Sequence, residues 1–349
     1  MKLRNKCWLT ALFALLTLGA CNDDETPAPN PAPTYDMTGF AKGVDVSWVT
    51  EMEKVGKKFY TSAGREMECM RLMRELGMNA IRLRVWVNPS DGWCGKEDVL
   101  MKAWRAHNLG FRLMIDFHYS DVWADPANQT KPAAWSNYTL DELKTAVADH
   151  TKDVLSALKE KGIDVEWVQV GNETRTGMLW PEGQATSGNF KNFADLTVSG
   201  YDAVKSVYPN AKVIIHLDGG ENNSNYTWMF DGLKQNGGKW DVIGMSLYPS
   251  WSTTETWEKL NEKCAANMKA LIERYGTEVM LCEVGMPWDD AIKAKAFLAD
   301  ILAKSKAIEG GKCLGVFYWE PEAYGGWKAY DKGAFDDEGK PTEAMDAFK

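Results

Sequence analysis

Two glutamates occupy positions at which a carboxyl group could take part in catalysis. Glu173 follows the run VQVGN and Glu283 follows VMLC, so each ends an apolar segment that reads as a buried strand. A carboxylate is costly to bury unless it is paired or hydrogen-bonded. Cleavage of a glycosidic bond uses two such groups: a protonated one serves the leaving oxygen and an ionised one attacks the anomeric carbon. The pair therefore predicts a glycoside hydrolase.

The stereochemical outcome of that chemistry depends on the distance between the two carboxyl groups. A separation of about 5–5.5 Å gives retention, whereas a wider gap admits a water molecule and gives inversion. For either glutamate alone, the alternative is a structural salt bridge to a barrel arginine such as Arg84. Two glutamates at two strand ends favour the catalytic interpretation.

Eight βα units are expected to position these residues. Apolar runs typical of strands lie at 43–48, 79–87, 111–118, 166–171, 211–217, 241–247, 278–282 and 313–318. Helical patterns lie at 65–76, 96–108, 140–161, 190–207, 228–236, 255–275, 290–306 and 342–348. Alternating strands and helices indicate a parallel sheet, and eight units in about 300 residues favour an α/β fold of the (β/α)₈ TIM-barrel type. No glycine-rich nucleotide loop follows the first strand, which weakens the alternative of an open doubly wound sheet.

The active site of a TIM barrel lies at the carboxyl ends of its strands. Every predicted strand delivers a polar or aromatic side chain to this rim, which packing alone does not explain. The candidate substrate-binding residues are Asp45, Arg84, Trp86, Asn88, His118, Asp121, Trp123, Asn172, His216, Tyr248, Trp251, Trp288 and Trp319.

Several of these candidates have a specific expected role. Arg84 beside Glu283 would keep the nucleophile ionised, because a nearby cation lowers the pKa of a carboxylate; the alternative is a structural ion pair inside the barrel. Asn172 is expected to hydrogen-bond a sugar 2-hydroxyl rather than to cap a helix. For His118 and His216, a contact within the protein and a contact with substrate remain equally open.

Aromatic side chains are concentrated at the same rim. Tyr248 is either a rim hydrophobe or a hydrogen-bond partner of the nucleophile. Seven tryptophans lie at or just beyond strand ends: Trp48, Trp86, Trp123, Trp180, Trp251, Trp288 and Trp319. Aromatic rings pack against the apolar faces of pyranose rings while polar groups bind the hydroxyls. This set predicts an elongated groove with several sugar subsites.

Eight motifs in fixed order identify a family. GVDVSWV, IRLRVWVNP, DFHYSDVWADP, QVGNE, HLDGG, SLYPSW, CEVGMPW and GVFYWEP occur along residues 40–349. As a set they resemble the arabinogalactan endo-β-1,4-galactanases of glycoside hydrolase family 53, which are retaining clan A barrels. The resemblance implies that Glu173 is the acid/base, that Glu283 is the nucleophile, and that the substrate is the β-1,4-galactan side chain of pectin.

The same resemblance places Arg84, Asn172, His118, Tyr248 and Trp319 around the −1 subsite. The sequence departs from the family's pattern after the seventh strand, where Val and Gly follow the glutamate instead of Thr and Ser or Ala. Some bacterial members carry a longer calcium-binding loop there. Because a helix is expected to begin a few residues later, the resemblance implies no metal, and no cofactor is expected.

The N-terminus reads as a lipoprotein leader. Residues 1–20 combine a basic start with an apolar stretch too short to span a bilayer, as in a secretory signal peptide. Leu18-Gly19-Ala20-Cys21 resembles a bacterial lipobox, with Cys21 lipidated. Residues 21–36 form an acidic and then Pro-rich linker. We expect an outer-membrane lipoprotein; the acidic run after Cys21 is equally compatible with a surface-export signal and with a solvated linker.

The remaining residues, 37–349, are expected to form one catalytic domain and a monomer. Removal of residues 1–20 deletes three basic groups and changes the formal charge from −9 to about −12. An acidic chain without basic clusters argues against nucleic acid as a partner. Five cysteines lie beyond the lipobox, at Cys69, Cys94, Cys264, Cys282 and Cys313, so at least one is free unless it pairs between chains.

Two alternative functions remain open from the sequence. Another clan A endo-glycanase, such as a mannanase or a xylanase, would share both glutamates. A surface glycan-binding lipoprotein without activity would need the tryptophan groove but would have no use for the two carboxyl groups.

Overall fold

The computed structural model describes residues 35–349. The predicted signal peptide, the lipobox cysteine Cys21 and all of the linker before Tyr35 lie outside the described residues. Tyr35–Lys349 forms one compact unit.

Eight parallel strands close into a barrel in sequence order, β1 to β8, and β8 pairs with β1. The strands are β1 (Ala41–Asp45), β2 (Ala80–Val85), β3 (Arg112–Phe117), β4 (Trp167–Val170), β5 (Lys212–Leu217), β6 (Val242–Leu247), β7 (Glu278–Val284) and β8 (Cys313–Trp319). The predicted (β/α)₈ fold is confirmed.

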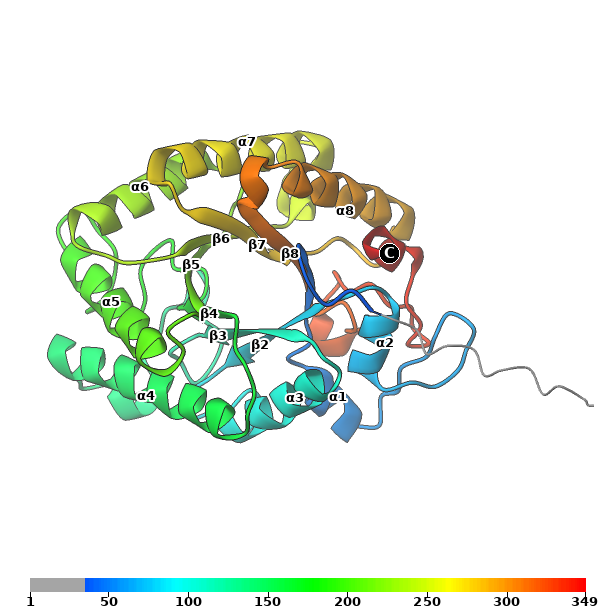
Figure 1. Ribbon diagram of the computed structural model, residues 1–349, viewed down its shortest axis with the longest axis horizontal. Helices are drawn as coiled ribbons and strands as arrows, with labels where there is room; N and C mark the ends of the chain where they lie inside the picture. The colour runs from blue at the N-terminus through cyan, green and yellow to red at the C-terminus, as the bar shows by residue number, and fades with distance from the viewer. Residues whose placement is uncertain (1–34) are drawn as a thin grey trace, which may run out of the picture. The chain divides into compact units, whose positions relative to one another are not determined.

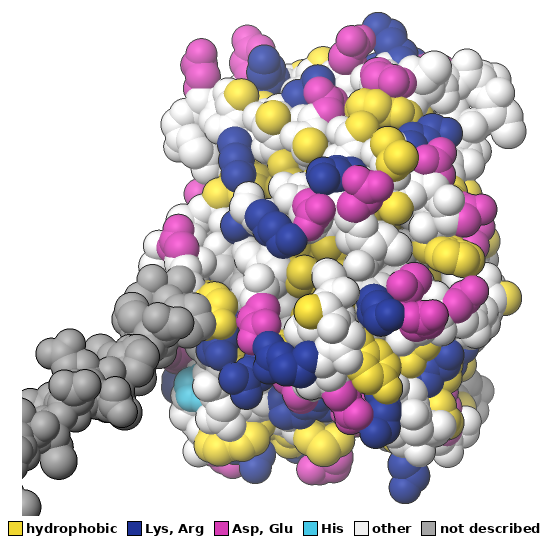
Figure 2. Space-filling view, turned by 90° about the vertical axis from the view of Figure 1, so that its right-hand side faces the viewer, with side chains coloured by type: hydrophobic (Ala, Val, Ile, Leu, Met, Phe, Trp, Pro, Cys, Tyr) yellow, Lys and Arg dark blue, Asp and Glu magenta, His cyan; other side chains and the backbone are white. Residues whose placement is uncertain are grey.

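Helices surround the barrel as an outer layer (Figure 1). The α-helices are α1 (Val49–Lys54), α2 (Cys69–Glu75), α3 (Lys96–Asn108), α4 (Leu140–Glu160), α5 (Phe190–Val207), α6 (Asn223–Gln235), α7 (Trp257–Tyr275) and α8 (Ala291–Lys306). Short 3₁₀ helices are η1 (Ala133–Trp135), η2 (Pro249–Trp251), η3 (Glu309–Gly311), η4 (Trp327–Ala329) and η5 (Glu343–Phe348). On the face drawn in Figure 2, acidic and basic side chains are interspersed.

Most differences from the predicted elements lie at helix ends and have local causes. Helix α2 begins at Cys69 rather than at residue 65, because the Glu68 side chain accepts hydrogen bonds from two backbone amides of its first turn. Helix α6 begins five residues earlier than expected, since Asn222 caps it. The expected last helix is a 3₁₀ helix, and α1 was not predicted.

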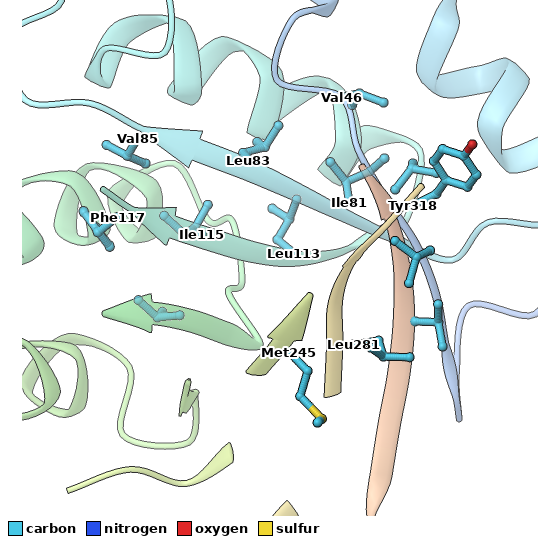
Figure 3. Close-up of a cluster of buried hydrophobic side chains, with 14 of the residues drawn as sticks. Val46, Ile81, Leu83, Val85, Leu113, Ile115, Phe117, Met245, Leu281 and Tyr318 are labelled. Carbon is cyan, nitrogen blue, oxygen red and sulfur yellow. The ribbon is translucent and has the colours of Figure 1, made fainter. Parts of the chain in front are cut away.

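Alternate residues of each strand face the two sides of the barrel wall. Ile81, Leu83 and Val85 of β2 point toward the helices, together with Leu113 and the other outward residues of β3 (Figure 3). These side chains are buried in the main hydrophobic core between strands and helices.

The inward positions change in character along the strands. Near the amino ends they are apolar and fill the barrel, with Met114, Trp167 and Phe317 in one buried cluster. Gly43 of β1 leaves room for the ring of Phe317, because a Cβ at Gly43 would lie 2.2 Å from a ring carbon. Toward the carboxyl ends the inward positions become charged or polar, and these residues form the candidate site.

Candidate active site

Glu173 lies just beyond β4, where the backbone turns sharply. Gly171 has a φ of 88° and Glu173 a φ of 43°, a left-handed conformation that is unfavourable for a residue with a side chain. This turn points both Asn172 and Glu173 into the barrel, where Asn172 contacts Arg82 and Glu173 contacts Ser246. A strained backbone at a strand end is typical of a functional position.

Glu283 faces the barrel because of a β-bulge in β7. Met280 and Cys282 belong to the inner apolar cluster and Leu281 to the outer core. Simple alternation would therefore turn Glu283 outward. The register shifts at this point, so that Met245 pairs with Leu281 and Ser246 pairs with Glu283. The extra residue re-aims the carboxylate into the site, as bulges beside active sites do.

Arg82 is the cation that holds Glu283. Its Nη2 lies 2.9 Å from Glu283 Oε1 and 2.9 Å from Asp116 Oδ2, and its Nη1 lies 2.7 Å from Asp45 Oδ2. Its Nε donates to Gln169 Oε1 at 2.7 Å. The guanidinium is completely buried, so it joins three carboxylates where solvent does not screen them.

The expectation that Arg84 lies beside Glu283 is wrong. Arg84 pairs instead with Glu320, Nη1 to Oε1 at 3.1 Å, and its guanidinium stacks over the Trp123 ring at 4.1 Å. Arg82 and Arg84 are two residues apart on one strand and face the same side, so composition alone does not distinguish them. The barrel register decides between them, and it brings Arg82 rather than Arg84 to Glu283.

The two candidate catalytic glutamates have different electrostatic surroundings. Burial raises the pKa of Glu173 well above its ordinary value, and the charge of Glu283 raises it further. Burial also raises the pKa of Glu283 to about 7, but Arg82 and the hydroxyl of Tyr248 act in the opposite direction. Tyr248 Oη donates to Glu283 Oε2 at 2.8 Å. Glu283 is therefore the group that ionises first, and Glu173 keeps its proton.

Asn172 has one hydrogen-bond donor left for a ligand. Its Oδ1 accepts from Arg82 and lies 2.9 Å from His216 Nδ1, while its Nδ2 donates to the carbonyl oxygen of Ala124 at 2.8 Å. An amide nitrogen carries two hydrogens, so the second is available next to Glu173.

Four of the other predicted residues use their polar atoms within the protein. Asp45 bonds Arg82 and the Ser47 hydroxyl. Asp121 accepts from the backbone amides of Asn88 and Ala133, so it organises the loops after β2 and β3. These contacts indicate a role in shaping the site.

The histidines His118 and His216 show the same pattern. His118 accepts from the Ala124 amide at Nδ1 and lies 3.0 Å from Asp116 at Nε2. His216 has no exposed surface, and both of its ring nitrogens have partners in the protein. Of the two interpretations left open for His216, the contact within the protein is therefore the one that the structure supports.

The tryptophans separate into a clustered group and an exposed group. In the cluster, Trp48 and Trp86 are buried and Trp123 and Trp319 are partly buried. Trp48, Trp86, Trp123 and Trp319 pack edge to face at centroid distances of 5.1–5.8 Å, and Tyr330 joins them. Trp251 is 64% exposed and packs on Tyr248 at 4.3 Å, and Trp288 is 36% exposed. Trp180 is half-buried, and its indole nitrogen donates to the carbonyl oxygen of Thr176 rather than to either glutamate.

A cavity of about 860 Å³ opens beside residues that bond the two glutamates. Ser246, which bonds Glu173, and Tyr248, which bonds Glu283, both line it. The lining continues over the loops after β5 and β6 to Trp251, and it includes Asp218 and Asn222. Its lining combines polar side chains with the aromatic rings of Tyr248 and Trp251.

Three buried residues near the glutamates were not predicted as site residues. Arg82 bonds three carboxylates of the site. Ser246 donates or accepts at Glu173 Oε1, 2.6 Å away, and Glu320 accepts from the Trp48 amide at 3.0 Å. Ser246 could have been identified from its position two residues before Tyr248, on the same face of β6.

Within residues 35–349, no group of three or more His, Cys, Asp or Glu side chains is arranged to hold a metal ion. None of the helices in that range is both long enough and apolar enough to cross a bilayer. The five cysteines in it, Cys69, Cys94, Cys264, Cys282 and Cys313, are all buried and unpaired.

Solved structures with the same architecture share sequence with this chain. One, from a study of two fungal β-1,4-galactanases, is 29% identical with a TM-score of 0.82, over 89% of this chain and 99% of the other. The GH53 catalytic domain of Ignisphaera aggregans is 30% identical with a TM-score of 0.81, over 92% and 98%. A xylanase A catalytic core at 13% identity and a TM-score of 0.60 shares the fold alone.

Curated relatives give the same result at the sequence level. The arabinogalactan endo-β-1,4-galactanase of Humicola insolens is 32% identical over 88% of this chain and 98% of its own length. The endo-β-1,4-galactanase of Bacillus subtilis is 30% identical over 81% and 70%. The model of glycosyl hydrolase family 53 matches residues 41–348. The chain therefore belongs to glycosyl hydrolase family 53.

Proposed function

We propose that this protein is an endo-acting, retaining arabinogalactan endo-β-1,4-galactanase. The observation that carries the proposal is the pair of buried glutamates beside a cavity of about 860 Å³: the pKa of Glu173 is raised well above its ordinary value, whereas Arg82 favours the charged form of Glu283. Membership of family 53 and relatives named as galactanases support the substrate class.

Glu173 acts as the general acid and then as the general base. Its high pKa keeps the carboxyl group protonated at neutral pH, so that it can give a proton to the leaving glycosidic oxygen. The carboxylate that results then takes a proton from water in the second step.

Glu283 acts as the nucleophile on the anomeric carbon. Arg82 and Tyr248 hold its two oxygens in place at 2.9 and 2.8 Å and favour its charged form. Asn172, with its free amide hydrogen, is placed to bond the 2-hydroxyl of the sugar that is attacked. The clustered tryptophans around Arg84, which include the partly buried Trp123 and Trp319, form the wall of this sugar's site.

The cavity beside Ser246 receives the part of the chain on the leaving-group side. It extends from Ser246 over the loops after β5 and β6, and the exposed ring of Trp251 offers a stacking surface. A cavity that extends beyond the catalytic pair suits internal cleavage of a polymer.

Linear β-1,4-galactan is the substrate that tests the proposal. We expect internal cleavage to short oligosaccharides, with the β-configuration retained in the first product seen by NMR. Glu173→Gln and Glu283→Gln should each lose activity by at least about 10³-fold while retaining galactan binding. Cleavage of mannan or xylan in place of galactan would favour another clan A glycanase, and binding without hydrolysis would indicate a glycan-binding protein.

We also propose that the protein is a monomeric lipoprotein of a bacterial outer membrane, anchored through Cys21. The signal-like residues 1–20, the lipobox and the Pro-rich linker support this. Cells fed labelled palmitate should incorporate label into the protein but not into Cys21→Ser. Protease added to intact cells distinguishes a surface location from a periplasmic one, and light scattering of the released protein gives its oligomeric state.

A further inference from the structure

A chain of hydrogen bonds connects Arg82 to the acid/base glutamate from behind. Arg82 Nη2 lies 2.9 Å from Asn172 Oδ1, which lies 2.9 Å from His216 Nδ1. His216 Nε2 lies 2.9 Å from Ser246 Oγ, and Ser246 Oγ lies 2.6 Å from Glu173 Oε1. Arg82, His216 and Ser246 are fully or almost fully buried, so few other partners compete for these atoms.

The orientation of the Asn172 amide is fixed by its two outer neighbours. Its oxygen faces a guanidinium, which can only donate, and its nitrogen faces the carbonyl oxygen of Ala124, which can only accept. A reversed amide would place donor against donor and acceptor against acceptor. The oxygen of Asn172 is therefore the atom that faces His216.

The orientation of Asn172 fixes the tautomer of His216. Nδ1 must carry a hydrogen, because otherwise two lone pairs would meet at 2.9 Å. The Glu173 amide nitrogen is also 3.4 Å from Nδ1, but that is beyond the usual hydrogen-bond range. Burial and then the charge of Arg82 lower the pKa of His216 well below its ordinary value, so the ring is neutral and Nε2 is an acceptor.

The tautomer of His216 in turn fixes the hydroxyl of Ser246. A hydroxyl has one hydrogen, and the acceptor Nε2 takes it. Ser246 then presents only lone pairs to Glu173 Oε1, at 2.6 Å. An isolated serine would donate to a carboxylate and favour its charged form. While its hydrogen is bonded to His216, Ser246 can bond only a carboxyl group that carries its proton.

We propose that His216 and Ser246 are positioning residues that hold Glu173 in its acid form, and that the Ser246 hydroxyl changes its acceptor from His216 to Glu173 after proton donation. The inference rests on the proposed role of Glu173. The proton of Glu173 forms the new O–H bond of the leaving sugar, and the hydroxyl of Ser246 rotates without losing its own proton. When water returns a proton to Glu173, the hydroxyl turns back to His216.

The charged and titratable groups that face this pair come from several elements. They are Arg82 of β2, Asp116 and His118 of β3, Arg175 and Asp218 after β4 and β5, Tyr226 of α6, Tyr248 after β6, and Glu283 of β7. Arg82 is the group that favours a neutral His216, while Asp116 opposes it. Arg82 thus favours the charged form of Glu283 directly, and through Asn172 it sets the tautomer of His216 at the start of the chain.

The histidine tautomers test the inference without any substrate. The chain contains four histidines, so ¹⁵N-histidine labelling gives few ring signals, and His216→Gln identifies the one that matters. We expect His216 as the Nδ1–H tautomer. His118 is an internal control with the opposite tautomer, because its Nδ1 accepts from the Ala124 amide. An Nε2–H tautomer or an imidazolium at His216 would overturn the inference.

The pH profile of hydrolysis tests the effect on Glu173. Ser246→Ala removes the acceptor, so the basic limb of kcat/KM should move down by about one pH unit. Ser246→Thr keeps a hydroxyl and should restore the limb. An upward movement, which a donating serine would cause, or no movement, would overturn the inference. If the protein with its natural sequence did not cleave galactan at all, the proposed function would be refuted, but the result on the histidine tautomers would remain valid.

Discussion

Arg82 Nη2 and Glu283 Oε1 lie 2.9 Å apart at the centre of the barrel, and the same nitrogen contacts Asp116. One guanidinium therefore neutralises a cluster of acids that would repel each other without it. Glu283 of β7 depends on a residue of β2, so its ionisation depends on closure of the barrel as well as on its own strand.

Arg82→Lys keeps a positive charge but cannot bridge three carboxylates and Asn172. We expect a loss of about 3 kcal/mol in the free energy of unfolding and at least about a 100-fold loss in kcat/KM. Urea unfolding and galactan hydrolysis measure the two effects. Arg112→Lys is the matched control, since Arg112 pairs with Glu166 near the surface and should cost under about 1 kcal/mol. Equal effects of the two substitutions would contradict the central role of Arg82.

Tyr248→Phe removes the hydroxyl that donates to Glu283. Because this bond lowers the pKa of Glu283, its loss should raise that pKa by about 0.5–1 unit. Glu283 works in its ionised form, so activity should disappear at a higher pH on the acid side, while the alkaline side stays in place. Measurement of kcat/KM against pH reports this. Tyr119→Phe, which removes a buried hydroxyl bonded to Thr151, should leave the acid limb unchanged.

Trp251→Ala removes the exposed ring at the far wall of the cavity. We expect KM for galactan to rise about tenfold with kcat little changed, because the ring contributes to binding of sugars remote from the bond that is cleaved. Trp104→Ala on α3 removes a ring of similar exposure that does not line the cavity, and it should change neither constant. Similar kinetics for both variants would argue against a sugar subsite at Trp251.

Glu320 and Glu322 give stability a pH dependence. Burial, and then the charge of Asp45, raises the pKa of Glu320 to about 7, while burial and the charge of Glu320 raise that of Glu322. A carboxyl group whose pKa is raised on folding stabilises the protein fully at a pH below its pKa in the unfolded chain. This contribution is lost as the pH rises to its pKa in the folded protein. Stability should therefore fall between about pH 4.5 and pH 7.

Glu322→Gln replaces an acid that has no hydrogen-bond partner for either carboxyl oxygen within the described residues. At pH 8 it should raise the free energy of unfolding by about 1–3 kcal/mol, and at pH 4 it should have little effect. Thermal unfolding at the two pH values measures this. Glu273 is exposed, and Glu273→Gln should have the same small effect on the free energy of unfolding at both pH values. A pH-independent effect of Glu322→Gln would show that its ionisation does not matter.

The fold, and the burial of Glu173 and Glu283 in one site, could be predicted because they depend on local patterns. The two apolar runs that are each followed closely by a glutamate are visible in the sequence. The eight apolar runs that alternate with helices specify the barrel. The sequence could not show that Arg82, rather than Arg84, contacts Glu283. Both arginines lie on one face of the strand, and only the register of the barrel decides between them. The burial of His216 likewise depends on contacts from β4 and β6 that no local pattern reveals.

The bulge in β7 makes the orientation of Glu283 depend on the number of residues that precede it in the strand. Side chains along a strand point alternately to its two faces, and the extra residue before Glu283 turns that side chain from the outer face to the inner one. Exchange of Cys282 for another small apolar residue leaves that orientation intact, whereas deletion of any one residue between Met280 and Glu283 reverses it. The chemistry of this barrel can therefore be switched off by a change in length that alters neither catalytic glutamate.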